Sequence, residues 1–258
     1  MLCVISPAKS LDFDTLAPTR EFTQPTLLAK SAPLVEQLRT YTPAKIAALM
    51  KISDTLAALN VARYAQWQRP FQLGSDAHPA KQALFAFTGD VYTGMNARDF
   101  SDADLHCAQR QLRILSGLYG VLRPLDLIMP YRLEMGTKLP TSEGNTLYDY
   151  WGTALTEALK ETLRENGMSV LINLASNEYF KAIDVKHLGC RVITPVFKDE
   201  KNGHYKIISF HAKKARGAMA AWIIKHRLTA PEQLTAFNGR GYRYSAAHSS
   251  GDTPVFIR

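Results

Sequence analysis

The sequence predicts an α/β protein in which helices surround a mixed sheet. Short apolar runs that read as buried strands alternate with longer segments of helical spacing, which is typical of α/β domains. An Asn-Gly pair between two β-rich runs predicts a late hairpin, and hence antiparallel strands in addition to parallel ones. The 258 residues are 46% hydrophobic and 21% charged, an ordinary globular composition. We therefore expect a single domain over residues 1–258.

The chain is expected to begin with one strand and three helices. Residues 2–6 form an apolar run that ends at Pro7 and predicts a short buried strand. Segments 26–40, 43–50 and 53–67 have helical spacing, and Thr42-Pro43 and Ser53-Asp54 are helix start signals. These helices form a predicted helical insertion at about residues 26–67.

Strands and helices alternate through the rest of the chain. Apolar runs at 83–88, 112–116 and 169–174 predict buried strands, and segments 97–110 and 147–166 have helical spacing. A loop at 175–177 is expected to precede a helix from Glu178. Residues 190–198 and 203–210 then read as two strands joined by the Asn202-Gly203 hairpin, and 212–227 as a basic amphipathic helix.

The cysteines and histidines give no sign of a disulfide framework or a metal site. Cys3, Cys107 and Cys190 are odd in number, far apart and set among apolar neighbours, so we expect reduced core thiols. The seven histidines are scattered without metal-ligand spacing. We expect no metal and no cofactor. The apolar stretch at residues 1–5 is too short for a secretory signal, and no window approaches a membrane span, which predicts a cytoplasmic protein without a membrane partner.

Positive charge is concentrated in one part of the sequence. The chain carries a net charge of +8, and residues 185–243 contain twelve Lys or Arg against three acids, a local surplus of +9. Such a block suggests a polyanion partner such as nucleic acid, or a surface whose charge only maintains solubility. The charge pattern leaves both interpretations open.

Residues 49–59 match the register of a helix-hairpin-helix element. In that element a tight turn and the start of the second helix present backbone N–H groups to a phosphate, without sequence preference. Lys51 and Ser53 stand where glycine is usual, with Ile52 between them and Thr55 in the first turn of the second helix. The alternative is an ordinary helical hairpin in which Ile52 enters the core and Ser53 is an N-cap.

The helix expected at 212–227 begins with Lys213, Lys214 and Arg216. Cations at the start of a helix oppose the helix dipole, so stability alone explains them poorly, whereas phosphate binding would use them. The alternative is a solvated charged face. The Arg and Tyr residues at 240–244 could stack on unpaired bases or form a tail strand.

Polar loops follow several predicted strands. Segments 6–10, 87–92, 115–126 and 173–178 are expected to meet in one crevice, because loops at the carboxyl ends of strands share an edge of an open sheet. Asp90, Arg132 and Glu134 are candidate acid, base and anion-binding groups, although no known catalytic motif is present. Tyr92 or Tyr119 would stack on a base. The alternative is that Arg and Glu pair across a turn to hold a long loop.

Six blocks resemble the YaaA family of bacterial peroxide stress proteins. They are ISPAK at 5–9, FTGDVY at 87–92, LSGLYGVLRPLD at 115–126, PYRLEMG at 130–136, INLAS at 172–176 and FHAKKARG at 210–217. The resemblance extends from Met1 to about Tyr242 and does not include the tail after Ser245.

The resemblance implies a DNA-binding protein of the hydrogen peroxide response that is linked to limiting free iron and to recombination repair. It also implies the family's cantaloupe fold, with a positively charged cleft and a helix-hairpin-helix. We expect binding of duplex, bubble or branched DNA without marked sequence preference, and binding rather than catalysis. An enzyme acting on a nucleobase or nucleotide is the alternative. The expected DNA-binding residues are Lys9, Lys51, Ile52, Ser53, Thr55, Lys181, Lys213, Lys214 and Arg216.

Overall fold

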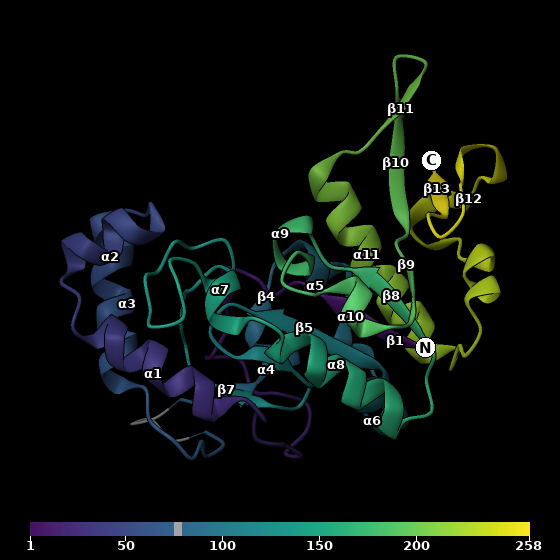
Figure 1. Ribbon diagram of the computed structural model, residues 1–258. Coiled ribbons are helices and arrows are strands. Elements are labelled where there is room, and N and C mark those ends of the chain that lie inside the picture. The colour runs from purple at the N-terminus through teal and green to yellow at the C-terminus, as the bar shows by residue number, and fades with distance from the viewer. Residues whose placement is uncertain (75–78) are drawn as a thin grey trace.

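The computed structural model, which describes residues 1–74 and 79–258, has the mixed α/β architecture that the sequence predicts (Figure 1). A five-stranded sheet lies at its centre, in the order β6-β5-β1-β8-β9. Its strands are β1 (Leu2–Ile5), β5 (Leu112–Ser116), β6 (Gly120–Leu122), β8 (Val170–Leu174) and β9 (Arg191–Ile193). Strands β5, β1, β8 and β9 are parallel, and β6 folds back antiparallel to β5. The inner strands are almost wholly buried, as expected for a sheet covered on both faces.

The register of the central strands determines which loops meet. Ile5 at the end of β1 pairs with Leu174 at the end of β8. The loops that begin at Ser6 and Ala175 therefore leave the same edge of the sheet side by side.

A second sheet has the order β11-β10-β13-β12. Its strands are β10 (Val196–Lys201), β11 (His204–Lys206), β12 (Arg243–Tyr244) and β13 (Val255–Ile257). The β10–β11 hairpin confirms the Asn-Gly prediction, because Asn202 and Gly203 both have positive φ angles, 56° and 76°. The predicted strand at 203–210 is too long, since β11 ends at Lys206 and a helix begins at Ser209. The tail after Ser245 supplies β13 and completes this sheet.

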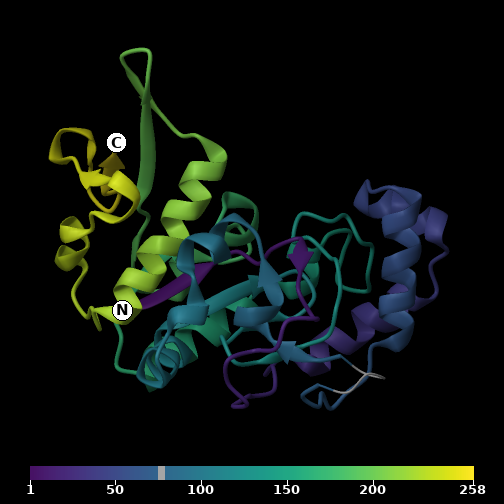
Figure 2. The same cartoon turned by 180° about the vertical axis from the view of Figure 1, so that it is seen from behind.

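Three helices form one end of the molecule (Figures 1 and 2). They are α1 (Leu28–Arg39), α2 (Pro43–Met50) and α3 (Asp54–Gln66), close to the predicted segments. The Thr42 hydroxyl accepts from the Lys45 N–H at 3.3 Å, and the Ser53 hydroxyl from the Leu56 N–H at 3.4 Å, so both predicted caps are present. Their buried side chains, Tyr64 among them, belong to the same hydrophobic core as the sheet.

The remaining strands are short, with two residues each. Two small antiparallel pairs join β2 (Ser10–Leu11) to β4 (Phe87–Thr88) and β3 (Lys81–Gln82) to β7 (Leu127–Ile128). The other helices are α4 (Ala83–Ala86), α5 (Asp90–Met95), α6 (Asp102–Gln111), α7 (Leu147–Trp151), α8 (Ala154–Glu165), α9 (Asn177–Phe180), α10 (Val185–Leu188) and α11 (Ser209–Lys225). The 3₁₀ turns are η1 (Ala97–Asp99), η2 (Pro231–Ala236), η3 (Gly239–Gly241) and η4 (Ala246–His248). Within the described ranges no helix combines the length and the apolarity needed to cross a membrane.

The structure corrects further predicted elements. The strand predicted at 190–198 is divided between β9 in the central sheet and β10 in the second sheet. The apolar run at 83–88 is mainly the helical turn α4, with only Phe87–Thr88 in a strand, because a short buried run has no periodicity that separates helix from strand. The segment 97–110 is interrupted where Ser101 and Asp104 form a capping box that starts α6 afresh. The segment 147–166 is interrupted at Gly152, whose φ of 47° lies outside the helical region.

Candidate functional site

A pocket of about 400 Å³ lies at the carboxyl ends of β1 and β8. We call it the strand-end pocket. Loops after three strands and one face of α11 line it, with residues 6–10, 88–92, Leu174, Ser176, Glu178, Tyr179, Lys213 and Arg216. The edge of a sheet where parallel strands end is a common place for ligands in α/β proteins. The predicted convergence of segments 6–10, 87–92 and 173–178 is confirmed.

Hydrogen bonds between the three loops fix the pocket wall. The Ser6 hydroxyl accepts from the backbone N–H of Ser176 at 2.9 Å and donates to the Ser176 hydroxyl at 3.3 Å. The Tyr92 hydroxyl donates to the Ser6 carbonyl at 3.1 Å, and burial raises the pKa of Tyr92 well above its usual value. These bonds connect residues from β1, β8 and α5, so the wall is preformed.

A close helix crossing brings the basic residues of α11 to this wall. A Cβ added at Gly94 on α5 would lie 2.0 Å from the Lys214 carbonyl oxygen, and one at Gly217 on α11 would lie 1.8 Å from that of Val91. Only glycine permits this approach, so the two backbones touch. The crossing places Lys213 and Arg216 beside the loop that starts α5.

Arg216 is half-buried in the pocket wall. Burial lowers the pKa of its guanidinium, and no neighbouring charge offsets that effect. Among the described residues no carboxylate forms an ion pair with Arg216 or with Lys213, whereas Lys214 lies 3.7 Å from the Asp90 carboxylate. The pocket therefore presents two cations whose hydrogen-bonding capacity is open to an anion.

A chain of ion pairs leads from the pocket toward α3. The Lys9 ammonium lies 2.8 Å from one Glu134 carboxylate oxygen, and the Arg132 guanidinium donates to the other at 3.0 Å. The Tyr64 hydroxyl of α3 donates to the Arg132 backbone carbonyl, and the Arg132 Nε is buried without a hydrogen-bond partner. Of the three candidate catalytic residues, only Asp90 lines the pocket. Glu134 contacts Lys9, which lines the pocket, and Arg132 contacts Glu134. The Arg132–Glu134 pair is thus the loop-holding contact of the alternative interpretation.

The fourth predicted segment, 115–126, does not reach the pocket. It forms the turn between β5 and β6, and its Tyr119 ring is completely buried. Its charged residues, Arg123 and Asp126, form an ion pair of 2.9 Å that also holds the Thr23 hydroxyl. The expected convergence of four segments is therefore wrong for this one. Tyr119 is completely buried and does not line the pocket, whereas Tyr92 is 8% exposed and lines it, so stacking of Tyr92 on a base stays a prediction.

The hairpin between α2 and α3 contributes no residue to the pocket and forms one end of the molecule, away from β1 and β8 (Figure 1). Lys51 is exposed and takes the left-handed conformation with φ of 52°, which glycine usually supplies. Ile52 is half-buried against the core, Ser53 caps α3, and Thr55 is exposed. The geometry is that of a helical hairpin with a compact three-residue turn. Of the other expected binding residues, Lys181 is exposed after α9, with its ammonium 5.2 Å from the centre of the Tyr148 ring.

Intramolecular ion pairs neutralise part of the basic block. Arg191 pairs with Asp252 at 2.7 Å, and Arg227 with Asp104 at 2.7 Å. These two arginines therefore stabilise the fold. Sequence reasoning assigned no role to Ser6, Ser176 or Glu178, although it placed them in polar loops after strands. Only the strand register shows that they share one wall.

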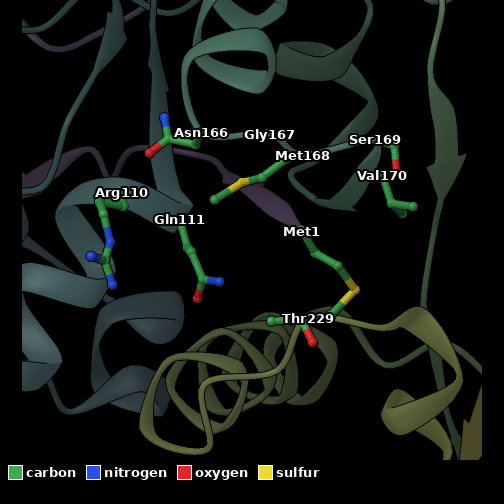
Figure 3. A pocket seen from close by; sticks show the side chains of 9 residues that line it. All are labelled: Met1, Arg110, Gln111, Asn166, Gly167, Met168, Ser169, Val170 and Thr229. Atoms are coloured by element: carbon green, nitrogen blue, oxygen red, sulfur yellow. The ribbon is translucent and has the colours of Figure 1, made fainter.

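A second pocket, of about 370 Å³, lies at the opposite, amino ends of β1 and β8 (Figure 3). The thioethers of Met1 and Met168 line it with Gln111, whose amide donates to the Leu228 carbonyl at 3.4 Å. Arg110 is the single charged side chain in its lining. Convergent charged groups are therefore found in the strand-end pocket and not here. No cluster of three or more His, Cys, Asp or Glu able to hold a metal ion occurs among residues 1–74 and 79–258.

Comparisons with known proteins agree along the whole chain. A family model described as "Peroxide stress protein YaaA" matches residues 1–248. A UPF0246 protein of Tolumonas auensis is 57% identical over 258 residues, which cover 100% of this chain and 98% of the relative. UPF0246 proteins of Shewanella loihica and Shewanella denitrificans are 54% and 55% identical, with the same coverage of 100% and 98%.

Proposed function

This chain belongs to the YaaA family of peroxide stress proteins, and on that premise we propose that it is a DNA-binding protein of the hydrogen peroxide response. It binds duplex and branched DNA largely without sequence preference and protects it during oxidative stress. The link to limiting free iron and to repair belongs to the same proposal and comes from the family resemblance alone.

The observation that carries the proposal is the pair of cations without carboxylate partners, Arg216 and Lys213, on one face of α11. A stabilising role would be served by an acid nearby, as Asp104 serves Arg227 at 2.7 Å. Because α11 begins at Ser209, Lys213 and Arg216 lie beyond its first turn, and it is the lack of an acid beside them among the described residues that favours an anionic partner. Phosphates supply that charge, and their binding releases counterions from DNA.

Lys51 and Lys181 extend the proposed interface beyond the pocket. Both are exposed, and Lys51 lies in the compact turn between α2 and α3. A turn of this kind can place backbone N–H groups and an ammonium near one phosphate, which gives affinity without sequence selection. Ile52 packs against the core and Ser53 caps α3, which holds the turn in position, and the exposed Thr55 in the first turn of α3 is available to the same phosphate.

The test is an equilibrium titration of duplex, bubble and single-stranded DNA at several salt concentrations. The wild type is compared with the triple variant Lys213→Ala, Lys214→Ala, Arg216→Ala. If each cation contacts one duplex phosphate, the slope of log affinity against log salt falls by about 0.9 per residue, or roughly 2.7 in total. Lys225→Ala is the matched control, because Lys225 is an exposed cation at the far end of α11. Absence of binding to all three DNAs at low salt would overturn the proposal.

The size of the strand-end pocket favours a second candidate function, an enzyme acting on a nucleotide. About 400 Å³ is a volume that suits a small molecule, and Asp90 lines it. In that case Asp90→Asn or Glu134→Gln abolishes turnover and leaves binding intact. Incubation of labelled nucleotides and DNA with each variant, followed by chromatography of the products, tests this candidate.

A further inference from the structure

We propose that the strand-end pocket receives a single nucleotide that has left the helical stack, so that DNA with an extrahelical nucleotide binds more tightly than fully paired DNA. The inference rests on the proposed DNA-binding function and adds to it the structure that the site recognises. The pocket would bind the extrahelical nucleotide, and the exposed cations would bind backbone phosphates.

The volume of the strand-end pocket suits a small ligand. A pocket of about 400 Å³ lies within the range of roughly 300–1,000 Å³ that is typical of small-ligand sites. A double helix is far too wide to enter such a pocket, and its backbone can only lie across the mouth. One base with its sugar and phosphate is a small-molecule ligand by volume. If DNA binds over this face, an extruded nucleotide is the part of it that can occupy the pocket.

The two cations of α11 at the pocket differ in burial. Arg216 is half-buried in the wall without a carboxylate partner, and Lys213 lies exposed one turn before it on α11. A guanidinium can form two parallel hydrogen bonds to a phosphate, and partial burial strengthens them. A half-buried arginine suits a phosphate drawn into the pocket even better than a duplex phosphate at the surface. Lys213 would neutralise the neighbouring backbone phosphate outside.

Polar groups that can hydrogen-bond to a base also line the pocket. One oxygen of the Glu178 carboxylate accepts from the backbone N–H of Gly136 at 3.0 Å. Its other oxygen accepts no hydrogen bond from a described residue and can accept one from a ligand. Asp90 and the Thr88 hydroxyl line the same space. Carboxylates and hydroxyls hydrogen-bond to the edge that a base exposes when it unpairs, as in enzymes that read flipped bases. The pocket therefore offers hydrogen-bonding groups for a base as well as cations for its phosphate.

Energetics then decide which DNA binds best. A paired base must be unstacked and unpaired before it can enter the pocket, whereas a bulged nucleotide is already free of its partner. Three duplexes of one sequence test this: fully paired, with a one-nucleotide bulge, and with the same bulge lacking its base. The bulged duplex is expected to bind roughly tenfold more tightly than the paired one, the effect of one charge-assisted contact. The baseless bulge is expected to lose part of this advantage, which separates base recognition from the flexibility of bulged DNA.

Variants of α11 connect the preference to the pocket. Arg216→Gln is expected to bring the bulge-to-duplex affinity ratio close to one, Arg216→Lys to restore part of it, and Lys225→Gln to leave it unchanged. A 2-aminopurine at the bulge gives an independent readout, because its fluorescence changes when it enters the pocket. Equal affinity for the three duplexes, or a preference that survives Arg216→Gln, would overturn this inference alone. Absence of binding to any of the three DNAs would overturn the proposed function as well.

Discussion

At the scale of single residues, Arg216 shows a conflict between stability and binding. Its charge is half-buried, burial lowers the pKa of its guanidinium, and no acid among residues 1–74 and 79–258 compensates. Desolvation of an unpaired charge costs free energy in the folded state. A residue kept in such a position is better explained by a ligand than by the fold.

Replacing this charge is therefore expected to leave the fold intact. Arg216→Met removes the unpaired cation but keeps most of the apolar stem, so the free energy of unfolding should stay equal or rise by up to about 1 kcal/mol. Urea denaturation measures this change, and the DNA titration of the same variant should show weaker binding. A loss of more than about 2 kcal/mol would indicate instead that Arg216 has a structural role.

In the cysteine residues, burial lowers the reactivity of the thiol groups. Burial raises the pKa of the Cys3 thiol to about 12 and also raises the pKa of Cys107 and Cys190. Since the thiolate is the reactive form, we expect little alkylation or peroxide oxidation of Cys3 and Cys107 in the native protein at pH 7. Mass spectrometry after iodoacetamide treatment, with and without denaturant, measures this. Rapid labelling of Cys3 in the native protein would show that the structure around β1 opens to solvent.

The same shift predicts a loss of stability in alkali. The folded state favours the neutral Cys3 thiol, while the unfolded chain ionises near pH 8.5. The unfolded state therefore gains relative to the folded state as the pH rises from about 8.5 toward 12. Cys3→Ala should weaken this pH dependence of the free energy of unfolding, at the cost of a small cavity.

At the scale of elements, the crossing of α5 and α11 determines where the cations lie. Gly94 and Gly217 allow the backbones of the two helices to touch, so Lys213 and Arg216 face the loops after β1 and β8. A wider crossing would move both cations out of the pocket. This contact therefore links the packing of the fold to the geometry of the site.

A single methyl group is expected to disrupt this crossing. Gly217→Ala places a Cβ 1.8 Å from the Val91 carbonyl oxygen, so we expect a loss of about 3 kcal/mol or more of unfolding free energy. Gly167→Ala is the control, because its surroundings are open and its φ of 60° should cost only about 1–2 kcal/mol. Thermal and urea unfolding provide the comparison. Equal losses in the two variants would contradict the close crossing.

At the scale of the whole molecule, two projecting parts lie on either side of the strand-end loops. The α2–α3 hairpin forms one end, and the β10–β11 hairpin rises from the other, next to the start of α11 (Figures 1 and 2). Lys201 and Lys206 are exposed on the β10–β11 hairpin, as Lys51 is on the α2–α3 turn. A duplex that bound both ends would span the central part of the molecule between them.

Contacts at the two ends should contribute independently. Lys51→Ala and Lys213→Ala are each expected to lower the salt-dependence slope by about 0.9, and the double variant by about 1.8. Additivity is expected because the residues lie on elements at opposite ends and share no partner. Lys225→Ala again serves as the control in the same titration. If Lys51→Ala has no effect, the α2–α3 hairpin is only a structural hairpin.

The sequence by itself determined the features that depend on neighbouring residues. The Thr42 and Ser53 caps, the Asn202-Gly203 turn and the buried runs of β1, β5 and β8 are local signals, and the corresponding elements formed where they were expected. Local signals failed at residues 83–88, where a four-residue turn and a strand have the same apolar pattern. The single domain, the helix-hairpin-helix function and DNA as the partner remain predictions.

Only the tertiary structure decided which residues form the site. Ser6 and Ser176 are 170 positions apart and meet because β1 and β8 are neighbours in the sheet. Arg216 lacks an acid partner only by virtue of how α11 packs, and Tyr119 is buried although its loop is rich in polar residues. Strand order and helix crossing arise from the sum of many long-range contacts, each weak by itself. No short segment of sequence encodes that sum, so spacing and composition could indicate the polar loops but not how they are assembled.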